Sequence, residues 1–147
     1  MSEALPLLLA VIAGVAIAVQ SATNGYLGRI AGSGLLATLI SFGVGLLALA
    51  AATLILRPRP PSGWIEAAPG WVWLGGLYGA VVVFAGAWAT PRLGAGTTLV
   101  MTVAAQVVVG VLLDHFGAFG LKVHPLGGLR AVGVLMVVAG AVMVQRG

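Results

Sequence analysis

Five apolar segments dominate the sequence, and each is long enough to cross a lipid bilayer. A transmembrane helix needs about 20 mostly apolar residues, and the chain offers such lengths at residues 5–26, 35–56, 71–90, 95–116 and 126–144. Only 7% of the 147 residues are charged, whereas a soluble domain carries roughly 25%. The apolar runs do not alternate with a period of two, which argues against a transmembrane barrel. We therefore predict an all-α polytopic membrane protein, with one transmembrane domain of five helices over residues 1–147.

The first segment is expected to remain in the mature protein. Its apolar stretch ends in a triplet of small and apolar residues, 16–18, that resembles a signal-peptide cleavage site. The residues before it, Ser2, Glu3 and Ala4, include no Lys or Arg, whereas a secretory signal begins with positive charge. We therefore predict a membrane-spanning helix rather than a cleaved leader.

Several classes of chemistry are excluded by the residues that the chain lacks. Without cysteine there are no disulfides, thiolate nucleophiles or cysteine metal sites. His115 and His124 with one nearby acid are too few ligands for a dedicated metal site. Phosphate loops, Gly-x-Ser-x-Gly motifs and zinc-protease helices are missing, and the net charge of +4 comes without the Lys/Arg clusters of nucleic-acid-binding proteins. We expect no enzyme activity, no cofactor, no metal and no nucleic-acid partner.

Basic residues are nearly balanced between the two sides of the membrane. Five crossings place the termini on opposite sides, and we name the side of the N-terminus side A and the other side B. Side A carries four basic residues, Arg57, Arg59, Lys122 and Arg130. Side B carries three, Arg29, Arg92 and Arg146. Because a Lys/Arg bias sets orientation, this balance predicts insertion in both orientations, unless the small excess on side A fixes one.

Insertion in both orientations would have a direct consequence for assembly. Many secondary transporters consist of two inverted halves around a site at the midplane. Two oppositely oriented copies form that arrangement, so we predict an antiparallel homodimer in which each chain is half of a ten-helix inverted-repeat transporter. Gly133 and Gly140, two turns apart on the last segment, have a spacing typical of close helix contacts in lipid. They predict a dimer contact, with packing inside one chain as the alternative.

Polar residues inside the segments are the candidate binding groups. Amides in hydrocarbon are costly unless they are hydrogen-bonded, so they are expected to face the bundle or a wet cavity. Most of them lie in the half of their segment nearer side B, where the segment at 95–116 also begins and its N-terminal amides favour anionic or carbonyl-bearing ligands. The candidate substrate-binding residues are Gln20, Asn24, Trp88, Arg92, Thr98, Thr102 and Gln106. The alternative is that the amides only bridge helices and that the threonines bond their own helix backbone.

Ionisable residues near the membrane are few. Of the three acids, Glu3 and Glu66 flank the segments, and Asp114 lies beside His115 at the side A end of the fourth segment. Asp114 is placed to pair with Arg130 at the start of the fifth segment, and proton handling by Asp114 and His115 is the alternative role. No carboxylate lies centrally in the bilayer, so direct exchange of an organic cation for protons at one buried acid is not supported.

Four features of the chain form a distinctive set, namely QSATNG at 20–25, PRLGA at 91–95, Gln106, and LDHFG at 113–117. This set resembles the motifs of a known family, the YdcZ-like inner-membrane exporters. The resemblance covers essentially the whole chain and implies a five-helix branch of the drug/metabolite transporter superfamily, located in the bacterial inner membrane and active as half of a ten-helix transporter. The chain is also similar to small multidrug resistance proteins in its half size, but it lacks their first-helix glutamate.

The sequence thus predicts a secondary transporter that exports a small metabolite or amphipathic compound by alternating access. Its expected partners are a small-molecule substrate, membrane lipid and a second, antiparallel copy. A non-transporting membrane scaffold or accessory subunit is the alternative, in which the amides serve helix packing alone. A lipid scramblase is a third possibility, which requires a polar groove open to lipid.

Overall fold

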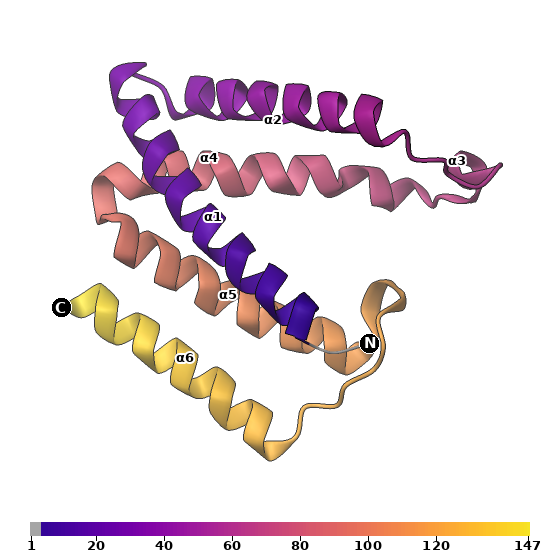
Figure 1. The fold of residues 1–147 in the computed structure, drawn as a ribbon. Helices are drawn as coiled ribbons and strands as arrows, with labels where there is room; N and C mark the ends of the chain where they lie inside the picture. Colours follow the sequence, from indigo (N-terminus) through magenta and orange to yellow (C-terminus); the bar gives the residue numbers. More distant parts are fainter. Residues whose placement is uncertain (1–3) are drawn as a thin grey trace. The chain divides into compact units, whose positions relative to one another are not determined.

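Helices make up nearly all of the chain, and five of them are long and apolar enough to cross a membrane. The computed structural model describes residues 4–147, so Ser2 and Glu3 of the predicted N-terminal flank lie outside the described residues. The long helices are α1 (Ala4–Ile30), α2 (Gly34–Leu56), α4 (Gly75–Leu93), α5 (Ala95–Phe116) and α6 (Gly128–Arg146) (Figure 1). The short ones are α3 (Trp64–Ala67), η1 (Gly70–Leu74) and η2 (Ala118–Gly120). The predicted all-α class with five transmembrane helices is confirmed.

The chain divides into two units, an N-terminal unit (Met1–Arg92) and a C-terminal unit (Leu93–Gly147). In the first, α1 and α2 pack together and are joined by a tight turn at 31–33. Gly32 adopts a positive φ of 65° there, which glycine tolerates at little cost. Ser33 then caps α2 by accepting the Leu36 N–H at 3.3 Å. The single transmembrane domain over residues 1–147 stays a prediction.

Two helices of the N-terminal unit continue past their predicted ends. Helix α1 extends to Ile30 rather than residue 26, because Gly28 continues the helix and the Ala31 N–H still bonds the Leu27 carbonyl at 2.9 Å. Helix α4 includes Pro91 and ends at Leu93 rather than at residue 90. Proline lacks an N–H and removes one bond of the helix ladder, and membrane helices tolerate this loss more often than soluble ones.

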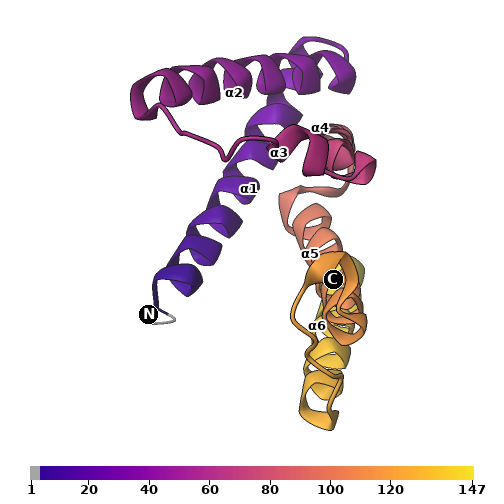
Figure 2. The same ribbon diagram turned by 90° about the vertical axis from the view of Figure 1, so that its right-hand side faces the viewer.

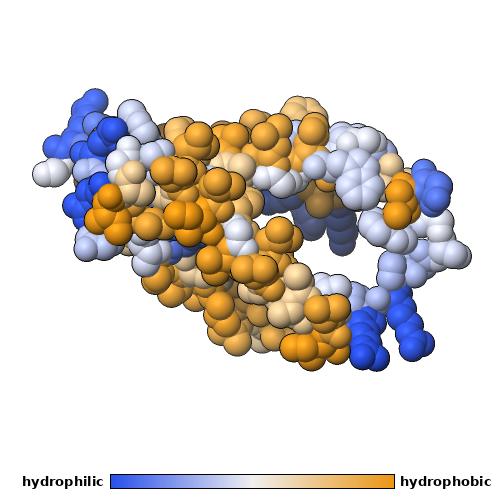
Figure 3. Space-filling view, turned by 90° about the horizontal axis from the view of Figure 1, so that it is seen from above, coloured by the Kyte–Doolittle hydropathy of each residue, from blue (hydrophilic) through white to orange (hydrophobic). Residues whose placement is uncertain are grey.

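Only small residues are buried in the part of the chain that the structure describes. The buried set is Ser21, Asn24, Gly25, Ala37, Thr38, Ala87, Thr98, Ala104 and Ala141. Large apolar side chains are exposed, and Figure 3 shows hydrophobic residues over much of the visible surface, with hydrophilic residues gathered in separate patches. Helices in lipid associate through close backbone approach at small residues rather than through a core of large ones. The burial pattern is therefore that of a membrane protein.

Close approach of α1 and α4 depends on glycine. A Cβ added at Gly86 would lie 3.1 Å from the Ser21 hydroxyl, and one at Gly25 would lie 3.2 Å from the Thr90 Cβ. Both distances are shorter than ordinary van der Waals contacts of about 3.5–4.0 Å. These two glycines therefore let the backbones of α1 and α4 come together, and they position the hydroxyl groups between the helices.

In the C-terminal unit, α5 and α6 lie side by side (Figure 1 and Figure 2). Gly117 ends α5 with a φ of 59°, and a Cβ there would come within 2.7 Å of a Val123 methyl group. Helix α6 begins at Gly128, two residues later than predicted, because the Leu126 N–H donates to the His115 ring and Gly127 is extended. These contacts attach the segment between the two helices to the C-terminal end of α5.

Candidate functional site

Two side-chain hydrogen bonds hold the N-terminal unit together. The Asn24 amide donates to the Ser41 hydroxyl at 3.1 Å and links α1 to α2. The hydroxyl groups of Ser21 and Thr90 lie 2.7 Å apart and link α1 to α4. Asn24 therefore bridges helices, as one of the sequence alternatives held, but its carbonyl oxygen can still accept a further hydrogen bond. Sequence reasoning missed the Ser21–Thr90 pair, although both residues adjoin the polar stretches that it singled out.

Gln20 behaves differently from Asn24, four residues away on α1. Asn24 is buried, whereas Gln20 is exposed. Gln20 lines a cavity of about 290 Å³ together with Ser41 and apolar residues of α2 and α4, including Phe42 and Val83. Because Ser41 also accepts from Asn24, the cavity adjoins the bond that links α1 to α2.

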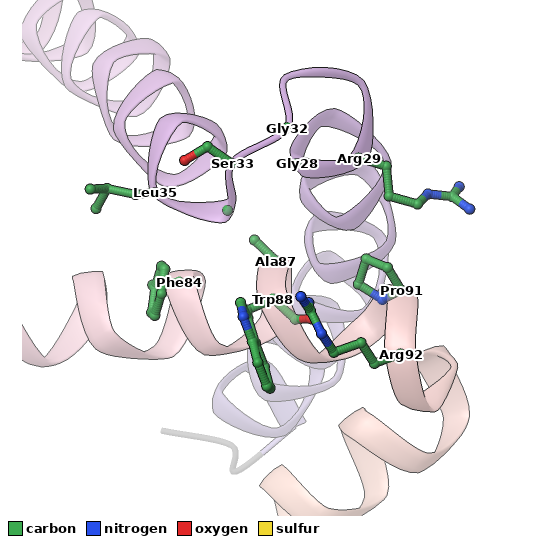
Figure 4. A pocket seen from close by; sticks show the side chains of 11 residues that line it. Gly28, Arg29, Gly32, Ser33, Leu35, Phe84, Ala87, Trp88, Pro91 and Arg92 are labelled. Carbon is green, nitrogen blue, oxygen red and sulfur yellow. The ribbon is translucent and has the colours of Figure 1, made fainter.

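Trp88 and Arg92 belong to a second, larger cavity of the N-terminal unit. This space of about 570 Å³ lies among the end of α1, the start of α2 and the last turns of α4. The Arg92 guanidinium lies 3.9 Å from the centroid of the Trp88 ring and donates to the Trp88 carbonyl. Figure 4 shows that Arg92 folds back over Trp88, whereas the side chain of Arg29, which also lines the cavity, points away from Trp88. The spacing of four residues on one helix face allows this contact.

Three candidate residues lie on α5, in the C-terminal unit. The Thr98 hydroxyl donates to the Gly94 carbonyl at 2.9 Å, and the Thr102 hydroxyl donates to the Thr98 carbonyl at 2.8 Å. Both threonines thus bond their own helix, as the alternative held, and each oxygen can still accept. Gln106 is exposed on the middle turn of α5. Convergence of these residues with those of α1 and α4 stays a prediction.

The predicted ion pair between Asp114 and Arg130 is present. One guanidinium nitrogen lies 2.7 Å from the Asp114 carboxylate, and the other donates to the His124 carbonyl at 2.9 Å. The His124 N–H in turn bonds the Asp114 carbonyl at 2.9 Å, and His115 accepts the Leu126 N–H at 3.0 Å through Nδ1. Three hydrogen bonds thus attach the 117–127 connector to the helices at either end of it, and the ion pair joins those helices directly. Among residues 4–147, no three His, Asp or Glu side chains gather as metal ligands would.

Comparison with known proteins identifies the family. The profile of the family described as "Putative inner membrane exporter, YdcZ" matches residues 5–143. The Inner membrane protein YdcZ of Escherichia coli (strain K12) is 27% identical over 147 residues, which cover 99% of this chain and 98% of that protein. No solved structure matches the chain. The match spans all five long helices and the connectors between them.

Proposed function

The chain belongs to the YdcZ family of inner membrane exporters, and from that premise we propose that it is a secondary transporter that works as an antiparallel homodimer by alternating access. It is a multi-pass inner membrane protein, and family membership with five apolar helices supports a transporter rather than an enzyme. The exported compound is a small metabolite or an amphipathic molecule. A non-transporting accessory subunit is the competing function.

Two exposed amides at mid-membrane depth carry the proposal. Gln20 lies three residues from the centre of α1, about 4.5 Å along the axis at 1.5 Å per residue. Gln106 lies at the centre of α5. Both are exposed, and neither forms a hydrogen bond within the described chain. An unsatisfied polar group in hydrocarbon costs several kcal/mol, so each amide requires a further partner, such as water, substrate or the second chain.

An inverted second copy is a natural source of that partner. Four basic residues on side A against three on side B give little orientational bias. Gly133 and Gly140 of α6 have no atom within 4 Å of where a Cβ would stand, so this face is open to another helix. Inverted halves around a midplane site are the common plan of secondary transporters, and two copies of five helices supply ten.

The substrate pathway follows from the polar residues. Amide and hydroxyl oxygens would coordinate the substrate, the Trp88 ring would stack against it, and Arg92 would attract its negative or carbonyl groups at the side B entrance. The coordinating residues are Gln20, Asn24, Thr98, Thr102 and Gln106. Asn24, Thr98 and Thr102 already donate within the chain, so these three act as acceptors, while Gln20 and Gln106 are free to donate and accept.

Orientation and export are tested together in cells. C-terminal fusions to a reporter active only in the cytoplasm and to one active only in the periplasm should both give signal, because the loop charges are nearly balanced. Untargeted mass spectrometry of the medium should then show compounds enriched when the chain is expressed. Signal from one compartment alone, with a larger protein co-purifying and no enriched compound, would instead establish the accessory function.

We propose Asp114 and His115 as the residues that couple transport to protons. Both hold the 117–127 connector, Asp114 through Arg130 and His115 by accepting from Leu126. A ring nitrogen that carries a proton cannot accept a hydrogen bond, so protonation at Nδ1 of His115 would release Leu126 and loosen the start of α6. Proton binding is thereby linked to the contact between α5 and α6.

We expect Asp114→Asn to make export of the enriched compounds independent of an imposed pH gradient, because the amide cannot carry the proton. Arg130→Gln is the matched control, since it breaks the same ion pair but keeps the carboxyl group. Vesicles with opposite pH gradients provide the measurement. A gradient response that survives in Asp114→Asn would remove this residue from coupling, whereas its loss in both variants would mean that the ion pair itself matters.

A further inference from the structure

In the described part of the N-terminal unit, no acidic side chain lines the larger cavity, whereas Arg29 and Arg92 both do. Arg92 lines the space with its guanidinium over Trp88 (Figure 4). The one carboxylate that the structure describes in this unit is Glu66 of α3. Helix α3 follows the C-terminal end of α2, whereas the cavity adjoins the N-terminal end, so Glu66 lies at the opposite end of the helices. The cavity is therefore electropositive.

The Arg92 side chain contacts Trp88 in two ways at this cavity. Its guanidinium donates to the Trp88 carbonyl and lies on the Trp88 ring. A guanidinium has five N–H donors, so donors remain for a ligand. Because these contacts restrain the side chain, binding an oxyanion costs less conformational entropy than at an arginine without them.

The start of α2 adds further donors to the same space. Ser33 accepts from Leu36, which leaves the N–H groups of Gly34 and Leu35 without an intrahelical acceptor. Both residues line the cavity. These amides and the positive end of the helix dipole reinforce the preference for negative charge that Arg92 sets.

Besides these polar groups, the cavity has an apolar wall. Phe84, Leu35 and the Trp88 ring face this space of about 570 Å³, which is within the usual size of small-molecule sites. A small inorganic anion would leave these surfaces without a partner. An oxyanion carried on an aromatic or short aliphatic body would satisfy both the donors and the apolar walls.

From this combination we infer that the cavity among α1, α2 and α4 binds amphipathic organic anions, with the oxyanion at Arg92 and the apolar body against Trp88 and Phe84. The inference rests on the proposed export function and names the substrate class for its side B entrance. An anionic lipid headgroup has the same chemistry, so the test separates a soluble anion from a lipid.

The test compares cinnamate with its neutral counterpart cinnamamide. The purified full-length chain in nanodiscs of phosphatidylcholine is titrated with each probe at neutral pH, and affinity is read from the rise in thermal midpoint with probe concentration. We expect cinnamate to bind roughly tenfold more tightly than cinnamamide, the gain of one charge-assisted contact. Equal affinity for the two probes would overturn the inference.

Two arginine variants locate the site. Arg92→Gln should abolish the preference for cinnamate, whereas Arg59→Gln should retain it, because Arg59 follows the C-terminal end of α2 and the cavity adjoins its N-terminal end. Arg92→Lys, which keeps the charge, should retain part of the preference, and circular dichroism checks that each variant is folded. Equal loss in Arg92→Gln and Arg59→Gln, or full preference in folded Arg92→Gln, would contradict the assignment.

The last experiment repeats the cinnamate titration with an anionic lipid in the nanodisc. If phosphatidylglycerol in the nanodisc displaces cinnamate, the natural oxyanion is a lipid headgroup. If cinnamate stays bound, the natural ligand is a soluble compound. Both results support an amphipathic anion site. Binding is measured without transport. Export in cells without anion preference would therefore contradict this inference alone, and anion binding without export would contradict the proposed function alone.

Discussion

Replacing Gln20 and Gln106 together with Leu is expected to abolish export while the protein stays folded and dimeric. Both amides are exposed at the middle of their helices. Leucine has nearly the same size but cannot hydrogen-bond to water or substrate, so the polar pathway would lose its central groups. Export is measured as the enrichment of secreted compounds in the medium, per unit of chain in the membrane, and we expect at least about a tenfold loss for two hydrogen bonds.

The thermal stability of the double variant distinguishes a role of the two amides in transport from a role in helix packing. If the amides bridged helices, their removal would cost roughly 0.6 kcal/mol each, up to about 1.7. Because neither amide has a partner within the described chain, we expect the thermal midpoint of the double variant to stay level or rise. Gln145→Leu, near the side B end of α6, is the matched control and should export normally. Normal export by the folded double variant would remove both residues from the pathway.

Helix number and fold class could be predicted from the sequence because they depend on hydropathy and length alone. Helix ends could not, because they depend on contacts. Gly28 and Pro91 are breakers in water, yet α1 and α4 continue through them in segments that have no water to compete for the backbone. The late start of α6 depends on the His115 side chain, eleven residues earlier in the chain, which accepts the Leu126 N–H.

In the candidate site, too, some contacts could be predicted from the sequence and others could not. Contacts within one helix follow from spacing: Thr98 and Thr102 bond the preceding turn, and Arg92 reaches Trp88 four residues before it. Contacts between helices depend on which faces meet. Nearly every face of these helices is apolar, so the pattern does not indicate that Asn24 faces Ser41 or that Ser21 faces Thr90. That choice is made by close approach at small residues, which are too frequent in this chain, with 23 glycines, to be assigned from sequence.

Two variants that are locked in opposite orientations are each expected to be inactive alone and active together. Ser62→Lys with Arg146→Gln leaves five basic residues on side A and two on side B. Arg59→Gln, Lys122→Gln and Gln145→Lys together leave two on side A and four on side B. Biases of this size set orientation in membrane proteins, so the compartment-specific reporters should give signal from a single side for each variant.

The decisive measurement is then export from cells that express both locked variants. An antiparallel dimer cannot form from copies that all face one way, so each locked variant should fall to the background of cells that lack the chain, and co-expression of the two should restore most of the wild-type export. Co-expressing two tagged copies of the same locked variant controls for dosage and should stay at background. Full export by either locked variant alone would show that the working unit is a monomer or a parallel dimer. In that case the exposed amides of α1 and α5 would have to find their partners in water, in substrate or in a second chain of the same orientation.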